Sequence, residues 1–358
     1  MKAVILVGGE GTRLRPLTYD IPKPMVPILN KPFMEHMLDL LKKHGIKEVV
    51  FSSGYKVEAF MEHFFNGEKL GLKLDYVVEE FPLGTAGAVK NVEKFIDGTF
   101  LVFNGDILTD ADLTSLIKYH REKKGIATLT LTPVDNPTIY GVIETDQNNR
   151  IQKFIEKPSW DRVTSNYINA GIYVLEPVIF KEMKPDKNYS FERQIYPDLL
   201  ERGDLLFAYK TGAYWLDIGS PEKYMKANQD ALLGNIKLET HLKREGSGIL
   251  LGDSSSIGSK ASLEPPIAIG KNCVISKGAQ IGKLSVIGNS CKIESGAVVK
   301  SSIVWDNTIV EKSARLENCI IGRNCLIGEE AVIESGAIIA SSTKIEPGKV
   351  IESGVKVG

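Results

Sequence analysis

The sequence has few cysteines and histidines and almost no net charge. Its 358 residues include four cysteines and five histidines, and its charged side chains sum to −1 at pH 7. A protein whose main partner is nucleic acid or an anionic membrane surface needs a basic excess, so this balance argues against both partners. Anionic substrates would have to be bound by local clusters of basic side chains.

Long apolar runs are also absent. The N-terminal apolar run, residues 2–7, is too short for a signal peptide, and no stretch approaches the length of a membrane-spanning helix. We therefore expect a cytoplasmic protein. With 43% apolar residues the chain is able to bury full hydrophobic cores, and its length predicts about two domains.

The hydrophobic pattern changes near residues 236–250, which we interpret as a linker between unlike domains, 1–235 and 251–358. Before the linker, apolar strands alternate with helical patterns, which predicts a mostly parallel α/β sheet. The predicted strands are 2–7, 48–52, 73–78 and 99–104, and the predicted helices are 33–43, 57–65 and 85–95.

After the linker, apolar residues recur at every sixth position. One series runs from Leu251 to Val299, and a four-residue step restarts it at Ile303, after which only Arg315 breaks the pattern. This period is typical of hexapeptide β-helix repeats, in which each hexad forms one face of a coil. By resemblance to that repeat class we expect a left-handed parallel β-helix of about six coils, with about eighteen residues in each.

The cysteines all lie in this repeat region, two residues before a repeat position, where alanine also occurs; they are Cys273, Cys291, Cys319 and Cys325. We interpret them as small buried side chains and free thiols, with Cys273 and Cys291 stacked in adjacent coils. Metal binding is the alternative, but the sequence has no Cys-x-x-Cys pair and no histidine beyond His241. The missing histidine also argues against acyltransferase activity, which commonly needs a general base.

A glycine-rich run follows the first predicted strand. It extends from Gly8 to Thr18, and Pro22-Lys23-Pro24 comes just after it. Glycines let several backbone N–H groups approach one anion, and Arg13 and Lys23 add positive charge. The run lacks the third glycine of a dinucleotide fingerprint and the Gly-Lys-Ser/Thr of a P-loop. Its internal arginine indicates chemistry on a nucleotide rather than binding alone.

Six further motifs follow in order, at residues 83–88, 103–106, 140–142, 154–158, 168–171 and 215–219. Together with the glycine-rich run, they resemble the sugar-phosphate nucleotidylyltransferase family over roughly the first two thirds of the chain. Within it, the resemblance is closest to the mannose-1-phosphate guanylyltransferases. It implies a Rossmann-like, mostly parallel mixed sheet and transfer of a nucleotidyl group from a nucleoside triphosphate to a sugar 1-phosphate.

The resemblance also implies roles for individual residues. The implied catalytic residues are Arg13, Lys23, Asp106 and Asp217, of which the two aspartates would bind Mg²⁺. The implied nucleotide-binding residues are Leu6, Gly8, Gly9, Gly11, Thr12, Arg13, Glu79, Pro82, Gly84 and Thr85. The implied sugar-phosphate ligands are Gly141, Glu156, Lys157, Asn169 and Gly171. Either aspartate alone would more often be a turn or helix-cap residue, which is how we interpret Asp110 and Asp112.

The choice of base depends on Glu79. Guanine presents two adjacent donors, and a carboxylate is an acceptor-only fork that fits them. Related thymidylyl and uridylyl enzymes place glutamine at this position; a solvated charge at a strand end is the alternative interpretation. We expect GTP and mannose 1-phosphate to give GDP-mannose. UTP, dTTP or ATP with glucose 1-phosphate, or a catalytically silent regulatory subunit of the same fold, are the alternatives.

The repeat register persists to Val357, so the last coil would present open backbone and apolar edges to water. We therefore expect a homo-oligomer with contacts through the β-helix. The other expected partners are the two substrates.

Overall fold

The computed structural model describes residues 1–54, 57–246 and 248–358. Ser247, which falls in the predicted linker, lies outside these residues. The chain forms two compact units. The first, which we call the sheet unit, contains Met1–Gly9 and Met37–Trp215, and the second, the β-helix unit, contains Glu10–His36 and Leu216–Gly358.

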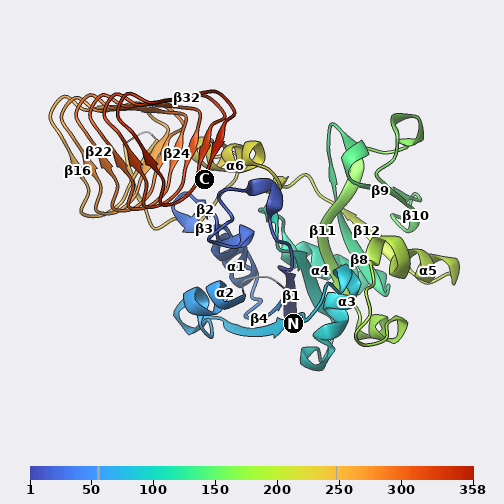
Figure 1. The fold of residues 1–358 in the computed structure, drawn as a ribbon. Coiled ribbons are helices and arrows are strands. Elements are labelled where there is room, and N and C mark those ends of the chain that lie inside the picture. The colour runs from blue at the N-terminus through green and yellow to red at the C-terminus, as the bar shows by residue number, and fades with distance from the viewer. Residues whose placement is uncertain (55–56, 247) are drawn as a thin grey trace. The chain divides into compact units, whose positions relative to one another are not determined.

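The sheet unit is built on a mixed sheet with a parallel centre (Figure 1). β1 (Lys2–Leu6) lies between β4 (Glu48–Ser53) and β6 (Phe100–Asn104), and β5 (Lys73–Val78) lies beyond β4. These parallel strands end at the same edge, where ligand-binding side chains gather in α/β proteins. The antiparallel part begins with β11 beside β6; its strands are β8 (Ala127–Pro133), β9 (Gly141–Thr145), β10 (Ile151–Glu156) and β11 (Tyr167–Leu175). The edge strand β12 (Leu206–Lys210) pairs parallel to β8.

The predicted α/β alternation is confirmed. Ala3, Val4 and Ile5 in β1 are fully buried, as expected for a central strand covered on both faces. The first five helices are α1 (Phe33–Lys43), α2 (Val57–Phe64), α3 (Gly84–Asn91), α4 (Leu113–Lys123) and α5 (Tyr196–Glu201). The predicted helix 85–95 is divided, because Val92 leaves helical geometry and a separate 3-10 turn covers Glu93–Phe95.

The two aspartates that we interpreted as helix-start residues have different positions. Asp112 is the N-cap of α4, where its carboxylate accepts a hydrogen bond from Ser115 N at 3.1 Å, so that prediction is confirmed. Asp110 caps no helix. It accepts from Tyr214 N at 2.9 Å, at the end of β7 (Ile107–Thr109).

The β-helix unit contains three parallel sheets made by stacked coils, so the predicted β-helix is confirmed. The first sheet contains β14 (Lys243–Glu245), β15 (Ile249–Leu251), β18 (Ile267–Ile269), β21 (Val286–Ile287), β24 (Ile303–Val304), β27 (Ile320–Ile321), β30 (Ile338–Ile339) and β33 (Lys356–Val357). The second contains β16 (Ser256–Ile257), β19 (Val274–Ile275), β22 (Lys292–Ile293), β25 (Ile309–Val310), β28 (Leu326–Ile327) and β31 (Lys344–Ile345). The third contains β17 (Ser262–Leu263), β20 (Gln280–Ile281), β23 (Val298–Lys300), β26 (Arg315–Glu317), β29 (Val332–Ile333) and β32 (Val350–Ile351). β14, which lies in the segment expected to be a linker, pairs antiparallel to β15.

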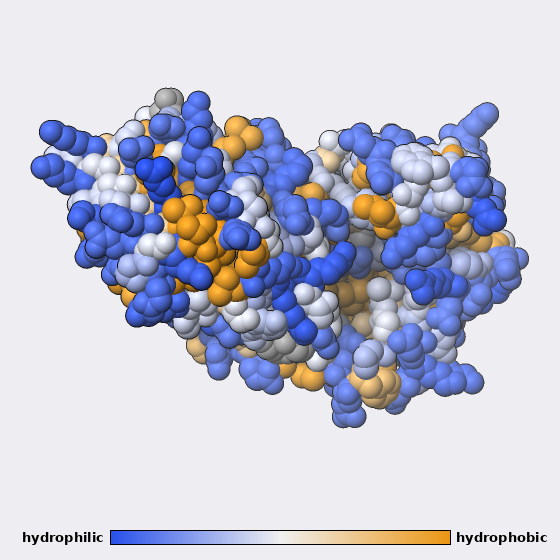
Figure 2. All heavy atoms as spheres, turned by 45° about the horizontal axis from the view of Figure 1, so that its top comes forward, coloured by the Kyte–Doolittle hydropathy of each residue, from blue (hydrophilic) through white to orange (hydrophobic). Residues whose placement is uncertain are grey.

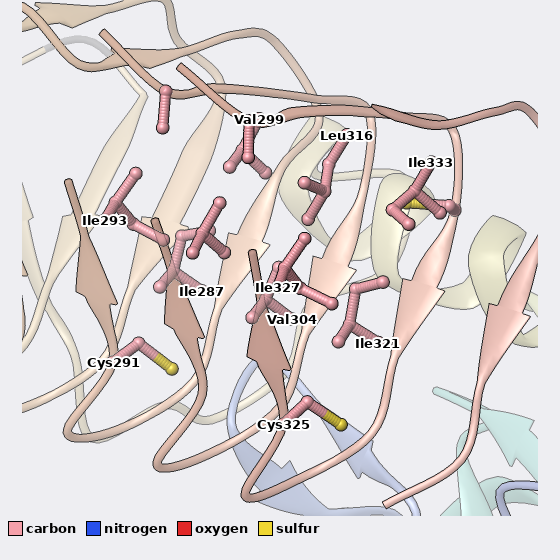
Figure 3. Close-up of a cluster of buried hydrophobic side chains, with 14 of the residues drawn as sticks. Ile287, Cys291, Ile293, Val299, Val304, Leu316, Ile321, Cys325, Ile327 and Ile333 are labelled. Atoms are coloured by element: carbon pink, nitrogen blue, oxygen red, sulfur yellow. The ribbon is translucent and has the colours of Figure 1, made fainter. Parts of the chain in front are cut away.

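The predicted register is wrong in the middle coils. After Val299, the core inside the coils contains Val304, Val310 and Leu316, whereas Ile309 and Arg315 face outward. Two five-residue steps, from Val299 to Val304 and from Leu316 to Ile321, replace the predicted four-residue step, because single residues are lost at turns without disturbing the stacking of the strands. Figure 3 shows Val299, Val304, Leu316 and Ile321 pointing into the interior of the coils.

The four cysteines are buried free thiols, as predicted. Cys273 and Cys291 lie in adjacent coils, where Val274 N donates to Cys291 O, and the Cys273 Sγ is 3.0 Å from Gly288 O. Burial raises the pKa of Cys319 to about 12, so its thiol stays protonated and unreactive. Among the described residues, no cluster of three or more ligating side chains forms a metal site.

Four further elements lie outside the mixed sheet and the coils. β2 (Pro27–Ile28) and β3 (Lys31–Pro32) form a hairpin, β13 covers Trp215–Asp217, and α6 covers Pro221–Leu233. Ser220 caps the start of α6, and Gly234 ends the helix in the left-handed conformation. In the part of the chain that the structure describes, no helix is long and apolar enough to cross a membrane.

Candidate active site

The glycine-rich run begins in the sheet unit, where Leu6 ends β1. Val7 N donates to Ser52 O at 2.9 Å, which keeps the chain in line with β4. A Cβ atom on Gly8 would lie 3.5 Å from Glu79 Oε1, and a Cβ atom on Gly9 would meet nothing within 4 Å. The first glycines thus lie beside the Glu79 carboxylate and leave space in front of the backbone.

Both oxygens of the Glu79 carboxylate accept hydrogen bonds. Ser52 Oγ lies 3.1 Å from Oε1, and Leu83 N donates to Oε2 at 3.4 Å. Ser52 itself is fully buried. Desolvation by burial raises the pKa of Glu79, because water is removed from the charged form. Glu79 is therefore a fixed, half-buried acceptor at the carboxyl end of the parallel strands, and not a freely solvated charge.

Asp106 lies at the same edge of the sheet. Gly105 N donates to Leu6 O at 2.8 Å, and a Cβ atom on Gly105 would lie only 2.5 Å from that oxygen. Only glycine permits this approach, which brings the half-buried Asp106 next to the end of β1. The motif at residues 103–106 therefore has a structural reason for its glycine, which places Asp106 at the ends of β1 and β6.

A pocket of about 420 Å³ opens in the sheet unit at the antiparallel strands β9, β10 and β11. Four of the predicted sugar-phosphate residues line it, together with Gly84 and Thr85 from the start of α3; the four are Gly141, Glu156, Lys157 and Asn169. Gly141 and Glu156 are directly paired across β9 and β10, and Lys157 has a left-handed φ of 47° just after β10 ends. Gly171 does not line the pocket; it packs against Asn104, which leaves no room for a larger residue.

Glu192 is one of the pocket residues that the sequence motifs did not mark, with Ser190 and Arg193. Its carboxylate accepts hydrogen bonds from Tyr173 Oη and Ser190 Oγ at 3.0 Å and from Thr85 Oγ1 at 3.2 Å. Asn169 Nδ2 donates to Tyr173 Oη at 2.8 Å. Burial raises the pKa of Tyr173, so its hydroxyl remains a donor. Glu192 thus holds the pocket wall together and adds a second carboxylate to Glu156.

The β-helix unit carries the remaining predicted residues. Gly11 has a φ of +65°, and a Cβ atom there would lie 2.9 Å from Lys23 Cβ, so the loop folds back tightly on itself. Thr18 Oγ1 fixes this fold by donating to Gly11 O at 2.9 Å. Thr12 and Arg13 follow in an exposed 3-10 turn, and Lys23 is buried. One loop therefore presents both predicted cations.

Asp217 and Arg13 lie together in the same unit. A Cβ atom on Gly219 would be 3.0 Å from Asp217 Oδ2 and 3.1 Å from the Arg13 guanidinium, so the glycine separates two oppositely charged groups. Lys223, on the first turn of α6, forms an ion pair with Asp217 Oδ1. The sequence analysis gave no role to Lys223, which no motif marked.

Comparison with known proteins shows which family the chain belongs to. The family model described as Nucleotidyl transferase matches residues 2–233. The chain belongs to the nucleotidyl transferase family. A second model, the EIF2B subunit epsilon LbH domain, matches residues 247–351, in agreement with the left-handed β-helix that we predicted.

The chain is similar to nucleotidyl transferases that differ in their base. It is 38% identical to a mannose-1-phosphate guanylyltransferase from Mycobacterium tuberculosis over 75% of either chain. It is also 38% identical to a UTP–glucose-1-phosphate uridylyltransferase from Synechocystis, over 66% of this chain and 65% of that protein. The crystal structure of HddC from Yersinia pseudotuberculosis complexed with GMP-PN is 33% identical and has a TM-score of 0.56; the match covers 64% of this chain and 98% of that one.

Two further predicted residues, Pro82 and Gly84, have structural roles. Pro82 O accepts a hydrogen bond from Asn188 Nδ2 at 2.9 Å. Gly84 has a φ of +71°, and a Cβ atom there would lie 2.5 Å from Tyr189 O. Both residues fix the segment between Glu79 and α3, and thereby fix the side of the pocket that Thr85 lines.

Proposed function

We propose that this nucleotidyl transferase makes GDP-mannose and pyrophosphate from GTP and mannose 1-phosphate. The observation that carries the choice of base is the fixed Glu79 carboxylate beside Gly8, since two acceptor oxygens match the N1–H and N2 donors of guanine. The similarity to mannose-1-phosphate guanylyltransferases supports the same choice. Incubation with both substrates should release pyrophosphate and give a product with the mass of GDP-mannose; an unchanged mixture would contradict the proposal.

The reaction needs no protein nucleophile. The sugar phosphate is ionised at neutral pH, and one of its oxygens attacks the α-phosphorus while the bond to the bridging oxygen breaks and pyrophosphate leaves. Arg13 and Lys23 stabilise the negative charge that develops on the phosphates, and backbone N–H groups between Gly8 and Thr12 bind the β- and γ-phosphates. The residues of the chain therefore act by orientation and by charge.

The pocket at the antiparallel side of the sheet binds the sugar phosphate. Lys157 supplies positive charge for its phosphate, and Glu156, Asn169 and Glu192 supply acceptors and a donor for sugar hydroxyls. Arg193, whose guanidinium lies 3.9 Å from Glu156, adds a second cation at the rim. The volume of about 420 Å³ is sufficient for a single hexose phosphate.

Asp106 and Asp217 suit Mg²⁺, which takes one or two carboxylates and completes its coordination with water and phosphate oxygens. Their donor set contains only hard oxygen ligands, in agreement with this ion, and Asp217 is already held in one orientation by Lys223. When bound, the ion would neutralise charge on the phosphates.

The guanine preference should depend on pH, because Glu79 must be ionised to accept two hydrogen bonds. Its pKa is raised, so protonation begins at a higher pH than for an ordinary glutamate. We expect the ratio of kcat/KM for GTP over dTTP to fall as the pH decreases from about 8 to about 5. The Glu79→Gln variant provides the control, since its ratio should not change over this range. A pH-independent ratio in the wild type would contradict the role of Glu79.

The β-helix should form contacts between copies of the chain. Val274 faces outward from the second sheet and is 43% exposed, and Val350 faces outward from the third and is 50% exposed. On the face that Figure 2 shows, the surface is mostly hydrophilic, and a hydrophobic area lies on the β-helix unit. We expect the full-length chain to be a homo-oligomer at micromolar concentrations by light scattering.

Val350→Glu combined with Val274→Glu should lower the mass measured by light scattering, because the new charges would lose water at the interface between subunits. Val178→Glu is the matched control, since Val178 is 41% exposed in the sheet unit. A wild-type protein that stays monomeric would refute this assembly.

A further inference from the structure

The loop that carries Arg13 and Lys23 belongs to the β-helix unit, although it follows β1 directly in the sequence. Glu10–His36 groups with Leu216–Gly358, whereas Met1–Gly9 belongs to the sheet unit. The predicted catalytic cations are therefore held by α6 and by the coils of the β-helix. Side chains that attach the loop to these elements are candidates for a role in catalysis.

The tip of the β2–β3 hairpin is attached by two side-chain amides. Asn30 Nδ2 donates to Ile287 O in β21 at 2.6 Å, and Leu29 N donates to Asn228 Oδ1 in α6 at 3.0 Å. Leu29 and Asn228 are both buried. The hairpin that follows Lys23 is therefore fixed to one coil and to α6 through groups that exclude water.

A buried hydrogen-bond chain attaches the first strand of the hairpin. Trp305 Nε1 donates to Tyr224 Oη at 2.9 Å, and Tyr224 Oη donates to Pro27 O at 2.6 Å. The two rings meet edge to face, with centroids 6.3 Å apart and planes at 88°. Burial raises the pKa of Tyr224, so its hydroxyl keeps the proton that it donates. These hydrogen bonds connect the β-helix, through α6, to the loop.

The same elements lie next to the catalytic groups. Pro27 follows the 3-10 turn Lys23–Met25, in which Val26 N donates to Lys23 O at 3.2 Å. On α6, Tyr224 directly follows Lys223, which forms the ion pair with Asp217. A displacement of Pro27 or α6 would therefore move the cations or the carboxylate.

We propose that Tyr224 and Trp305 are positioning residues for nucleotidyl transfer, acting through the backbone of Pro27 to hold the loop that presents Arg13 and Lys23. This inference rests on the proposed function. Both side chains are buried, and neither lines the pocket proposed for the sugar phosphate. The β-helix is then part of the catalytic framework, in addition to any role in assembly.

The first test is kinetic. Tyr224→Phe removes one hydroxyl from the chain and should lower kcat by about tenfold, whereas KM for the sugar 1-phosphate should stay within about twofold, because its pocket belongs to the sheet unit. Trp305→Phe should lower kcat less, because the Tyr224–Pro27 bond remains. The double variant should resemble Tyr224→Phe alone, since the indole donor has already lost its acceptor.

The second test does not depend on activity. Amide hydrogen exchange in residues 22–33 should become faster in Tyr224→Phe and in Trp305→Phe, with no change in the sheet unit. Tyr196→Phe is the matched control, because Tyr196 is fully buried and its Oη has no hydrogen-bond partner among the described residues. It should change neither exchange in the loop nor kcat.

The proposal would be overturned if residues 22–33 exchanged at the wild-type rate in both variants. It would also be overturned if exchange became faster throughout the chain, since a general increase indicates general destabilisation. An unchanged kcat in a Tyr224→Phe variant whose loop exchanges faster would also overturn it. If Tyr224→Phe does not fold, the kcat and the loop exchange of Trp305→Phe test the proposal in its place. If the wild type releases no pyrophosphate with any substrate, the proposed function fails, and loop exchange alone decides the attachment.

Discussion

Asp106→Asn and Asp217→Asn should each lower kcat by orders of magnitude while the protein stays folded. Asparagine has nearly the same volume as aspartate but carries no charge, so it binds Mg²⁺ much more weakly. Both aspartates are half-buried, Asp106 at a turn and Asp217 at the end of β13, and neither belongs to the hydrophobic core, so the substitutions should cost little stability. Steady-state pyrophosphate release together with a thermal melting curve measures both effects.

Two controls separate loss of the metal from other effects. Lys223→Gln breaks the ion pair with Asp217 but keeps the carboxylate, so it should reduce kcat far less than Asp217→Asn. Asp112→Asn makes the same chemical change at the N-cap of α4, where asparagine is an equally good cap, and should leave activity unchanged. Full activity in both Asp106→Asn and Asp217→Asn would disprove the assignment of these residues.

Glu79→Gln should lower the preference for GTP over dTTP by about tenfold or more. The substitution places an amide donor against a donor of guanine and leaves a buried polar group unpaired, at a cost of about 1 to 3 kcal/mol. Because 1.4 kcal/mol corresponds to about one decade, the ratio of kcat/KM values for the two nucleotides is the appropriate measure. Ser52 and Leu83 hold the side chain in place, so the new amide is not free to turn away at no cost.

Glu80→Gln is the matched control, since Glu80 is the exposed neighbour of Glu79. It makes the same chemical change outside the site and should leave the nucleotide ratio unchanged. A wild type that prefers UTP or dTTP, or a ratio that Glu79→Gln does not change, would show that the base is not guanine while leaving nucleotidyl transfer intact.

The sequence predicted most of the fold because its patterns are local. β1, β4, β5 and β6 are apolar runs bounded by turn residues, and the isoleucines of the coils mark most of the repeat. The register between residues 300 and 320 could not be predicted in this way. Consecutive apolar residues, such as Ile303 and Val304, fit either register, and the distinction depends on turns that lose one residue.

The candidate site was predictable only where motifs mark it. Glu156 and Lys157 are adjacent in one motif, and both line the pocket of the sheet unit. Glu192 lies in no motif, and its relation to Thr85 and Tyr173 arises only when distant segments pack together. The same is true of Tyr224 and Trp305, which look like ordinary core residues in the sequence.

One measurement tests the central claim most directly: the release of pyrophosphate by the full-length protein with GTP, ATP, UTP and dTTP, each combined with mannose, glucose and N-acetylglucosamine 1-phosphates. We predict the highest kcat/KM for GTP with mannose 1-phosphate, and loss of that activity on removal of divalent metal with EDTA. No release with any combination, or a clear preference for another base, would contradict the account.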